Sequence, residues 1–173
     1  MYRFDMEKRE WALLAGTPTE PNATFLEPRY CHEMVKYGEK LYVISGCDRN
    51  ITLAIHTWVY TYITLEHIPA FNLVTNRWEP VDTRPWVDEK GSEHYPVPRH
   101  GQAFGSLGEY CYIMGGRIVR EKEATIVLDD CWALHLPTLT WSRLPCSLPT
   151  PLCFHSAGIT KKGNKLYNPM TLT

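Results

Sequence analysis

Apolar and aromatic residues occur along this chain in short runs, separated by Gly, Pro, Asn or charged stretches. Helical periodicity is poor throughout, and 13 prolines leave few uninterrupted windows for a helix. Short apolar runs bounded by turn residues are typical of strands joined by turns. The pattern therefore predicts an all-β protein.

The runs form a unit that occurs twice in full. The first copy holds residues 28–32, 40–46, 68–73 and 77–79, and the second holds residues 98–102, 110–116, 130–136 and 140–142. Pro28 and Pro98 are 70 residues apart, and so are Gly46 and Gly116. An internal repeat of this kind indicates a modular fold in which neighbouring units pack on one another.

Each unit predicts four antiparallel strands. In the first copy the strands are expected at 32–37, at 40–45 after a tight turn at Gly38-Glu39, at 70–73, and around Trp78. The same order is expected in the second copy. Four short strands within roughly 50 residues, with a glycine pair and a late tryptophan, are typical of a kelch blade in a β-propeller.

Two kinds of residue mark the repeat. Small residues end each second strand, where they permit unusual dihedral angles and close backbone approach: Gly46, Gly115 and Gly116. Tryptophans mark each fourth strand, and we expect their large flat rings to pack between neighbouring sheets: Trp11, Trp78 and Trp141.

Partial copies flank the complete ones. Residues 1–15 are expected to form strands three and four of a preceding blade, and 151–168 strands one and two of a following blade. The prediction is an incomplete kelch propeller over 1–168, with blade pieces at about 1–15, 28–82, 98–145 and 151–168, and a tail at 169–173. About three blade equivalents fall short of the roughly four to eight of a closed ring. We therefore expect a piece of a larger propeller, or a degenerate product, with exposed sheet faces and edges.

Composition narrows the function classes. A formal net charge of −1 gives no electrostatic footprint for nucleic acid or an anionic membrane. The apolar stretches are too short to span a bilayer. Six scattered cysteines without a Cys-x-x-Cys motif are interpreted as reduced, partly buried side chains, which predicts a cytoplasmic or nuclear location.

Two segments lengthen the link between the second and third strands. Residues 48–67 are rich in Thr, Ile, Tyr and Val, which favours extension of the strands over a free loop. Residues 117–123 are charged and are therefore expected to be exposed. Long loops on a rigid ring often carry recognition. Trp58 and Trp86 lie outside the repeat and are candidate anchors for a partner, with local packing as the alternative.

The candidate binding residues precede the first strand of each unit. Arg29 and Arg99 occupy the same place, at one mouth of the expected central channel, where guanidinium groups would suit a carboxylate. The alternative is an arginine that pairs with a backbone group or an acid as a structural staple. Tyr30 and His100 directly follow these arginines and are expected to line the same mouth.

Other polar residues suggest structure rather than chemistry. His32 and His155 match in position, where the second unit has Gln102, and we interpret them as blade-packing residues. Neither they nor Cys31 and Cys47 fit a metal-ligand template, so no metal or cofactor is predicted. No catalytic motif is present, which favours binding over catalysis.

Several stretches resemble a known family. Residues 37–43, 71–78, 95–99, 141–145 and 151–157 are similar to the kelch-repeat members that act as substrate receptors of cullin-2 RING ubiquitin ligases. The resemblance implies capture of a C-terminal degron at the propeller mouth, with Arg29 and Arg99 as candidates for the peptide carboxylate. It also implies docking of elongin B–elongin C and cullin-2 through a segment absent from residues 1–173. Ser45, Gln102 and the two long links depart from the family pattern.

Three hypotheses follow. The first is a non-enzymatic adaptor that presents a protein to a ubiquitin ligase. The second is a structural or actin-binding kelch scaffold. The third is an enzyme of the galactose-oxidase type, whose copper site of Tyr, His and Cys we cannot assemble from this sequence.

Overall fold

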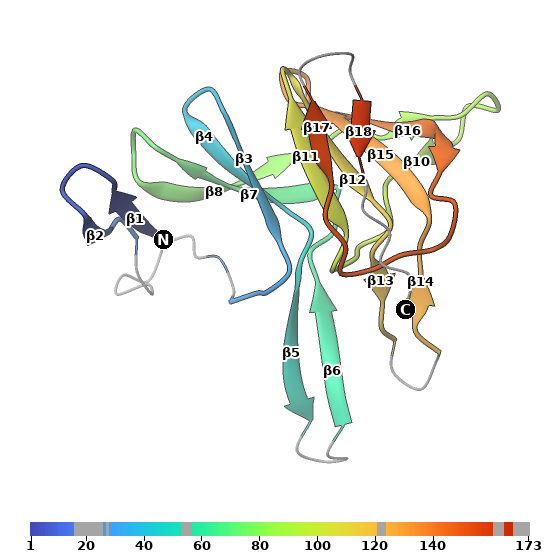
Figure 1. Ribbon diagram of the computed structural model, residues 1–173, viewed down its shortest axis with the longest axis horizontal. Helices are drawn as coiled ribbons and strands as arrows, with labels where there is room; N and C mark the ends of the chain where they lie inside the picture. The colour runs from blue at the N-terminus through green and yellow to red at the C-terminus, as the bar shows by residue number, and fades with distance from the viewer. Residues whose placement is uncertain (16–25, 27, 53–56, 121–123, 161–164, 168–173) are drawn as a thin grey trace.

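The computed structural model describes residues 1–15, 26, 28–52, 57–120, 124–160 and 165–167, and every regular element within them is a β-strand. Two four-stranded antiparallel sheets stand side by side, with two-stranded hairpins around them (Figure 1). This confirms the predicted all-β, unclosed arrangement. The predicted tail at 169–173 lies outside the described residues.

The first full blade consists of β3 (Glu33–Tyr37), β4 (Lys40–Ile44), β7 (His67–Asn72) and β8 (Arg77–Asp82), paired in that order. The turn between β3 and β4 uses Gly38, whose φ is 56°. A left-handed φ is expected in a two-residue hairpin turn. The strands therefore follow the predicted pattern of short runs and turns.

The second full blade repeats this arrangement with β11 (Ala103–Leu107), β12 (Tyr110–Met114), β15 (Asp130–His135) and β16 (Thr140–Ser147). The turn from β11 to β12 uses Gly108, with φ of 59°. The register between β15 and β16 shifts between Asp130 and Trp132. Such a bulge makes the end of the outer strand bend.

Half blades precede and follow these sheets along the chain. They are the hairpin of β1 (Tyr2–Asp5) with β2 (Glu10–Leu13), and that of β17 (Gly158–Thr160) with β18 (Lys165–Tyr167). Backbone geometry identifies β1 and β2 as strands three and four. Arg9, Asn76 and Leu139 have φ of 58°, 54° and 53°, and each precedes its tryptophan by two residues.

The long links form hairpins of their own. β5 (Cys47–Thr52) and β6 (Thr57–Tyr62) make a ribbon that projects away from the full blades, and β13 (Arg117–Ile118) pairs with β14 (Ile126–Val127) (Figure 1). A third small hairpin joins the blades, with β9 (Trp86–Val87) and β10 (Glu93–His94). The prediction that 117–123 is exposed is wrong at its start, because Ile118 is buried and Arg117 is half-buried.

The main core lies between the two full blades. Val35, Tyr42 and Ile44 of the first blade pack with Cys111 and Ile113 of the second. Trp141 is completely buried in this cluster. Its indole N–H donates to the carbonyl of Leu65 at 2.9 Å and contacts the Thr83 hydroxyl at 3.2 Å. Burial of a tryptophan with its polar group satisfied ties the two sheets together.

Trp11 differs from the predicted packing role. Its side chain is 71% exposed, and its ring contacts Phe4 on β1, with 5.0 Å between the ring centroids. Trp78 is half-buried and lies edge-on to Phe71 at 5.2 Å. The three tryptophans therefore occupy equivalent positions in environments that range from fully buried to mostly exposed.

Backbone hydrogen bonds join successive blades. The N–H of Gly46 donates to the carbonyl of Arg99 at 3.2 Å, and that of Gly116 donates to Leu152 at 2.8 Å. The two glycines have φ of 91° and 94°, which L-residues with side chains rarely adopt. A Cβ at Gly46 would also lie 2.7 Å from the Cβ of His32. These positions require glycine for conformation and for space.

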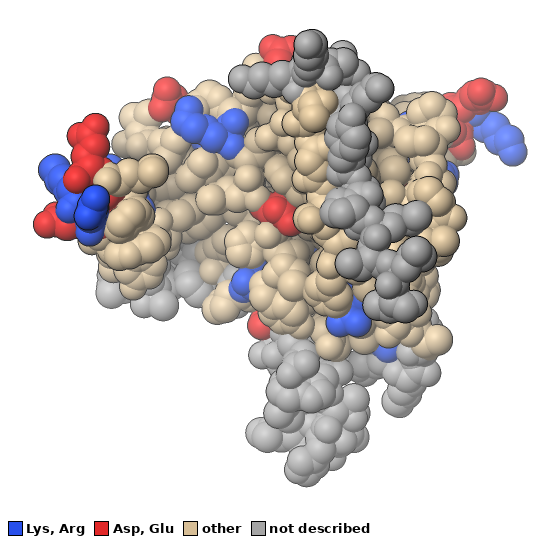
Figure 2. All heavy atoms as spheres, viewed as in Figure 1, with Lys and Arg blue, Asp and Glu red and all other residues tan. Residues whose placement is uncertain are grey.

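Charged side chains of both signs are interspersed on the face in Figure 2 and gather on the β1–β2 hairpin. In the part of the chain that the structure describes, no helix has the length and apolarity needed to cross a bilayer.

Candidate functional site

The candidate site lies where each first strand is approached by the link ribbon of the same blade. Tyr30 forms an antiparallel bridge with Cys47 at the start of β5, and His100 forms one with Arg117 at the start of β13. Reciprocal backbone hydrogen bonds of 2.9–3.1 Å hold both bridges. The repeat therefore places the residue that follows Gly46 or Gly116 beside the residue that follows the repeat arginine.

His100 and Arg117 form the polar centre of this site. His100 is completely buried, and Arg117 donates its Nε–H to His100 Nε2 at 3.0 Å. Burial, and secondarily the charge of Arg117, lowers the pKa of His100 from 6.5 to about 4. His100 is therefore neutral near pH 7, with Nε2 as the acceptor and the proton on Nδ1. Nδ1 has no hydrogen-bond partner among the described residues.

Aromatic rings surround this centre. His100 lies parallel to Tyr60 at 5.7 Å and near Tyr62 at 5.6 Å, with Phe154 at 5.8 Å and Tyr30 at 6.2 Å, all between ring centroids. The Arg117 guanidinium carbon stands 4.6 Å from the centroid of the Phe154 ring. We call this group the His100 cluster: His100, Arg117, Tyr30, Tyr60, Tyr62 and Phe154.

The outer part of the His100 cluster reaches the surface. Phe154 is 58% exposed and Tyr30 is 39% exposed, while Tyr60, Tyr62 and Arg117 are half-buried. The Tyr62 hydroxyl accepts a hydrogen bond from the backbone N–H of Val119 at 2.7 Å, which fixes the end of the ribbon. A buried polar centre beneath exposed rings is an arrangement suited to binding an extended ligand.

Backbone conformation places Phe154 in the cluster. Cys31, Gly101 and Phe154 hold the same repeat position and share φ of 54°, 65° and 56°. A Cβ at Gly101 would lie 3.0 Å from ring atoms of Phe154. The glycine in the second blade therefore makes room for the aromatic side chain of the next one.

Arg99 does not lie open at the mouth, which corrects the prediction that it is available there for a peptide carboxylate. The side chain is completely buried and forms an ion pair with Asp130 of the same blade, with a second hydrogen bond at 2.9 Å. It also donates to the carbonyls of Gly115 at 3.0 Å and Val97 at 2.9 Å. These contacts match the alternative interpretation, in which the repeat arginine pairs with a backbone group or an acid and has a structural role.

Asp130 is held ionised by this pairing. Burial alone would raise the pKa of the Asp130 carboxyl, but the hydrogen bonds and charge of Arg99 bring it below its usual value. The indole N–H of Trp132 also donates to Asp130 at 2.7 Å. The partner of the repeat arginine is thus an acid on the third strand.

Arg29 and His32 lie at the corresponding place in the first blade. Arg29 is half-buried, and His32 is exposed. Burial of part of the imidazole, followed by the charge of Arg29, lowers the pKa of His32. A peptide-binding role for Arg29 stays a prediction.

His155 and Gln102 pack against the second glycine pair. A Cβ at Gly115 would lie 3.1 Å from His155 Cε1, and one at Gly116 would lie 3.1 Å from the Cβ of Gln102. Burial lowers the pKa of His155. These side chains fill space beside the blade junction. Within the described residues, no three His, Cys, Asp or Glu side chains gather as a metal site would require.

Sequence analysis missed four members of the His100 cluster. Arg117 is 70 residues after Cys47, so alignment of the residues that follow each glycine pair would have identified it. Phe154 aligns with Cys31 and Gly101 in the same way. Tyr60 and Tyr62 lie on the ribbon, where no repeat exists to guide prediction. Of the two proposed anchors, Trp86 packs edge-on against Trp132 at 6.2 Å, and the Trp58 side chain lies outside the described residues.

Comparisons with known proteins match this architecture. The family model described as the KLHDC2/KLHL20/DRC7 Kelch-repeats domain matches residues 1–168. Kelch domain-containing protein 10 of Xenopus tropicalis is 32% identical over 163 residues, which cover 94% of this chain and 34% of that protein. The Homo sapiens protein of that name is 31% identical, with 94% and 32% covered. The chain thus spans about a third of the length of these relatives.

A more distant relative and a solved structure are also similar to this chain. The Kelch domain-containing protein 10 homolog of Drosophila melanogaster is 30% identical over 177 residues, which cover 94% of this chain and 26% of that protein. The solved structure titled "Structure of YjhT" superimposes with a TM-score of 0.53 at 12% identity, covering 82% of this chain and 34% of that one. This last likeness shows a shared fold.

Proposed function

This chain belongs to the KLHDC2/KLHL20/DRC7 kelch-repeat family, and on that premise we propose that it is a non-enzymatic module which binds the C-terminal peptide of a protein substrate at the His100 cluster. The proposal places the peptide carboxylate on Arg117 and the preceding peptide residues on the exposed rings.

The observation that carries the proposal is the setting of Arg117. Its Nε–H is held by His100 and its planar group lies over Phe154, so the guanidinium is oriented before a ligand arrives. The proposal assigns its two terminal nitrogens to the ligand carboxylate. A guanidinium binds a carboxylate with two parallel hydrogen bonds, which a preoriented arginine makes at a lower entropic cost.

The aromatic rings support a peptide ligand in particular. Tyr is enriched at binding hot spots because it offers a large rigid surface together with a polar end. Tyr30 and Phe154 are the exposed rings of the His100 cluster and would offer such surface to a peptide. His100 remains neutral near pH 7, so Arg117 supplies the positive charge of this centre.

We further propose that the chain acts as the recognition part of a cullin-2 RING ubiquitin ligase in the cytoplasm or nucleus. Support comes from the family membership and from the similarity to Kelch domain-containing protein 10. Elongin B–elongin C and cullin-2 would then dock through a segment outside residues 1–173. Co-purification of the full-length protein with elongin B–elongin C tests this part. Recovery with actin filaments instead would favour the scaffold hypothesis.

Peptide binding is tested with pairs of fluorescent peptides that end in a free carboxylate or in an amide. We expect the free acids to bind more tightly, and Arg117→Gln to reduce their affinity at least about tenfold, because a bidentate charged contact is lost. Arg77→Gln, at an exposed position on β8, is the matched control and should leave binding unchanged. Equal binding of acid and amide would contradict the proposal.

A further inference from the structure

Two cysteines meet between the third and fourth strands of the second full blade. Asp130 is paired with Ser147 in the register of β15 and β16, and one step further along each strand stand Cys131 and Cys146. Residues opposite one another in antiparallel strands have Cα atoms about 4.5–5.5 Å apart. A disulfide spans a Cα separation of about 4.4–6.8 Å. The strand register therefore predicts a backbone separation that a disulfide between these two cysteines can bridge.

A bulge follows this point of the sheet. Trp132 is paired with Arg143, so residues 144–146 of β16 stand against Cys131 alone. Pro145 lies in the middle of the bulge and has no N–H with which to continue the ladder. Extra residues on one strand disrupt the ladder locally. The two sulfur atoms can therefore approach one another without breaking regular strand pairing.

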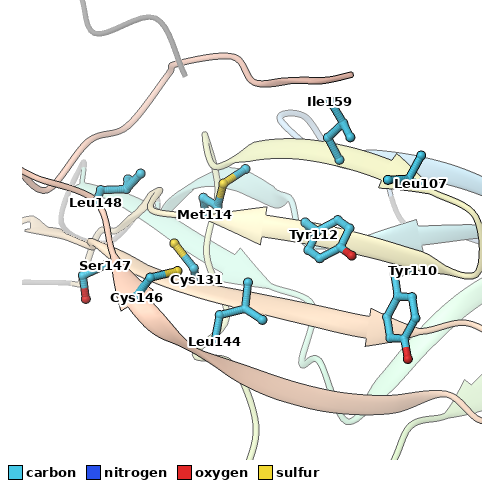
Figure 3. Close-up of a pocket in the computed structure, with 10 residues that line it drawn as sticks. All are labelled: Leu107, Tyr110, Tyr112, Met114, Cys131, Leu144, Cys146, Ser147, Leu148 and Ile159. Atoms are coloured by element: carbon cyan, nitrogen blue, oxygen red, sulfur yellow. The ribbon is translucent and has the colours of Figure 1, made fainter. Parts of the chain in front are cut away.

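The side chains of the two cysteines are already in contact. Figure 3 shows their sulfur atoms pointing toward one another, and a hydrogen bond joins the two thiols. Cys131 is 5% exposed, packs in a small apolar cluster with Met114, and donates its thiol to the carbonyl of Asp129 at 3.9 Å. The packing of the sheet thus holds the Cys131 sulfur beside that of Cys146.

The two thiols differ in their access to solvent. Cys146 is exposed, whereas Cys131 is buried. Cys146 lines the hollow of about 650 Å³ in Figure 3 and a second hollow of about 330 Å³, which Trp86 of β9 also lines. The second hollow lies between β9 and the end of β16, so a small reagent reaches Cys146 from the segment that joins the two full blades.

The buried thiol is the less reactive of the pair. Burial, followed by the neighbouring Cys146, raises the pKa of the Cys131 thiol, so Cys131 stays protonated near pH 7. The thiolate is the nucleophilic form of cysteine, and exposure favours its reaction with an oxidant. Cys146 is therefore the thiol that an oxidant meets first, and Cys131 is placed to react second.

We propose that Cys131 and Cys146 form a redox modification site, at which a peroxide oxidises the two thiols reversibly to a disulfide between β15 and β16. In the first step the Cys146 thiolate attacks one oxygen of hydrogen peroxide and the O–O bond breaks. The products are a sulfenic acid on Cys146 and a hydroxide, which takes up the proton that Cys146 released and becomes water.

The second step joins the two sulfur atoms. The Cys131 sulfur bonds to the Cys146 sulfur, the S–O bond breaks, and the hydroxyl group leaves as water with the Cys131 proton. Two electrons pass from the two thiols to one hydrogen peroxide, which is reduced to two waters. A thiol reductant reverses the reaction by exchange with the disulfide.

The disulfide has a mechanical consequence for the blade. It closes a loop between residues 131 and 146 and fixes the end of β16 to β15, where the bulge interrupts their pairing. Closing a loop restricts the unfolded chain and stabilises the folded one. Asp130, which precedes Cys131, holds the buried guanidinium of Arg99. The restraint therefore acts beside a structural ion pair of the same blade.

Mass spectrometry tests the bond. The reduced chain is treated with an equimolar amount of hydrogen peroxide, remaining thiols are blocked with N-ethylmaleimide, and the chain is digested with trypsin without reductant. Trypsin cuts after Arg143, so only a disulfide joins the peptide of Cys131 to that of Cys146. Cys153 belongs to the same tryptic peptide as Cys146, and Cys153→Ser is therefore the matched control, which should form the bond as the parent does.

We expect the disulfide between positions 131 and 146 to dominate in the folded chain and to become one of several in denaturing urea. Dithiothreitol should remove it. Absence of this disulfide from the oxidised folded chain, or an equal share of it in urea, would overturn the proposal.

Single substitutions test the roles of the two thiols. Cys146→Ser, at an exposed position, should keep the fold and form no disulfide at Cys131. Cys131→Ala should leave a sulfenic acid on Cys146, which dimedone labels. Oxidation should raise the urea midpoint of Cys153→Ser but not that of Cys146→Ser. Labelling of another cysteine in place of Cys146, or an equal rise in both midpoints, would contradict the assignment.

Discussion

His100 and Arg99 are neighbours in sequence and both are inaccessible to solvent, yet their side chains have different partners. Arg99 forms an ion pair with Asp130, and two backbone carbonyls accept further hydrogen bonds from its guanidinium group. His100 faces a cationic guanidinium and aromatic rings, so burial and Arg117 keep it neutral. The same backbone turn therefore holds one structural ion pair and one neutral acceptor beside a positioned arginine.

The low pKa of His100 makes stability depend on pH. Between pH 6.5 and about 4 the unfolded chain binds a proton at this residue and the folded chain does not. Stability should therefore fall as pH decreases through this window, by about 1–3 kcal/mol from this group. Urea unfolding at pH 7, 6, 5 and 4 measures the loss.

His100→Gln is the control for this prediction. It retains a polar side chain of similar size but cannot titrate, so the difference in unfolding free energy between parent and variant should narrow as pH falls from 7 to 4. His32 and His155, whose pKa values are also lowered, contribute equally to both proteins. A difference that does not change with pH would contradict the assignment.

Residue positions were predictable where the repeat supplied a comparison. Arg99 and His100 stood out because Arg29 and Tyr30 precede them by 70 residues. Their burial was not predictable. The acid that pairs with Arg99 is Asp130, 31 residues further along the chain, and the first blade has His67 at the equivalent strand position. A sequence pattern locates a side chain on a strand end but does not reveal its partner.

At the scale of elements, the turns at the ends of the second strands set how each blade meets the next. Gly46 and Gly116 end the second strands in a left-handed conformation and allow the backbone to approach the next blade. Short strands of five or six residues on either side need this geometry to align with the neighbouring sheet. The two glycines are therefore required at the blade junctions.

Two glycines in the first blade allow a matched test. We expect Gly46→Ala to lower the free energy of unfolding by about 3 kcal/mol or more, because its φ of 91° strains a side chain and its Cβ would lie 2.7 Å from that of His32. Gly38→Ala should cost only about 1 kcal/mol, since nothing lies within 4 Å of the added atom and φ is 56°. Chemical denaturation of both variants measures the contrast, and equal losses would show that the junction tolerates a side chain.

The ends of most strands in the full blades were predictable to within about three residues. Hairpin turns and short apolar runs mark where these strands begin and end. The β5–β6 ribbon was anticipated only as extended chain, and its pairing as a separate sheet was not. Its Thr, Ile, Tyr and Val content indicates strand, but composition does not reveal which strand is its partner. The charged link after Gly116 was misjudged because Arg117 and Ile118 pair with β14 before the chain reaches its polar part.

At the scale of the whole molecule, the two full blades share one core, and Trp141 connects them through the Leu65 carbonyl and the Thr83 hydroxyl. We expect Trp141→Phe to lower the free energy of unfolding by about 2 kcal/mol, through lost packing and a lost buried hydrogen bond. Urea unfolding followed by far-ultraviolet circular dichroism measures the change. A single transition in parent and variant is expected, because both sheets lose the same interface, and two separate transitions would show independent blades.

The number of blade pieces was predictable from spacing, whereas the exposure of Trp11 was not. Its position matches that of Trp141, but burial of either ring depends on a preceding blade. Trp141 has one in the chain, and Trp11 has none among the described residues. Repeat proteins derive stability from neighbouring units, so a residue at the edge of the array cannot be judged from its own unit.

The bonds from Gly46 to Arg99 and from Gly116 to Leu152 have a consequence for how these blades can diversify. Both ends of each joint are main-chain atoms. The side chain of the residue whose carbonyl accepts can therefore differ, as it does between Arg99 and Leu152, and the joint stays in place. The chemistry displayed at the rim can therefore vary from one sector to the next without altering how the sectors are assembled.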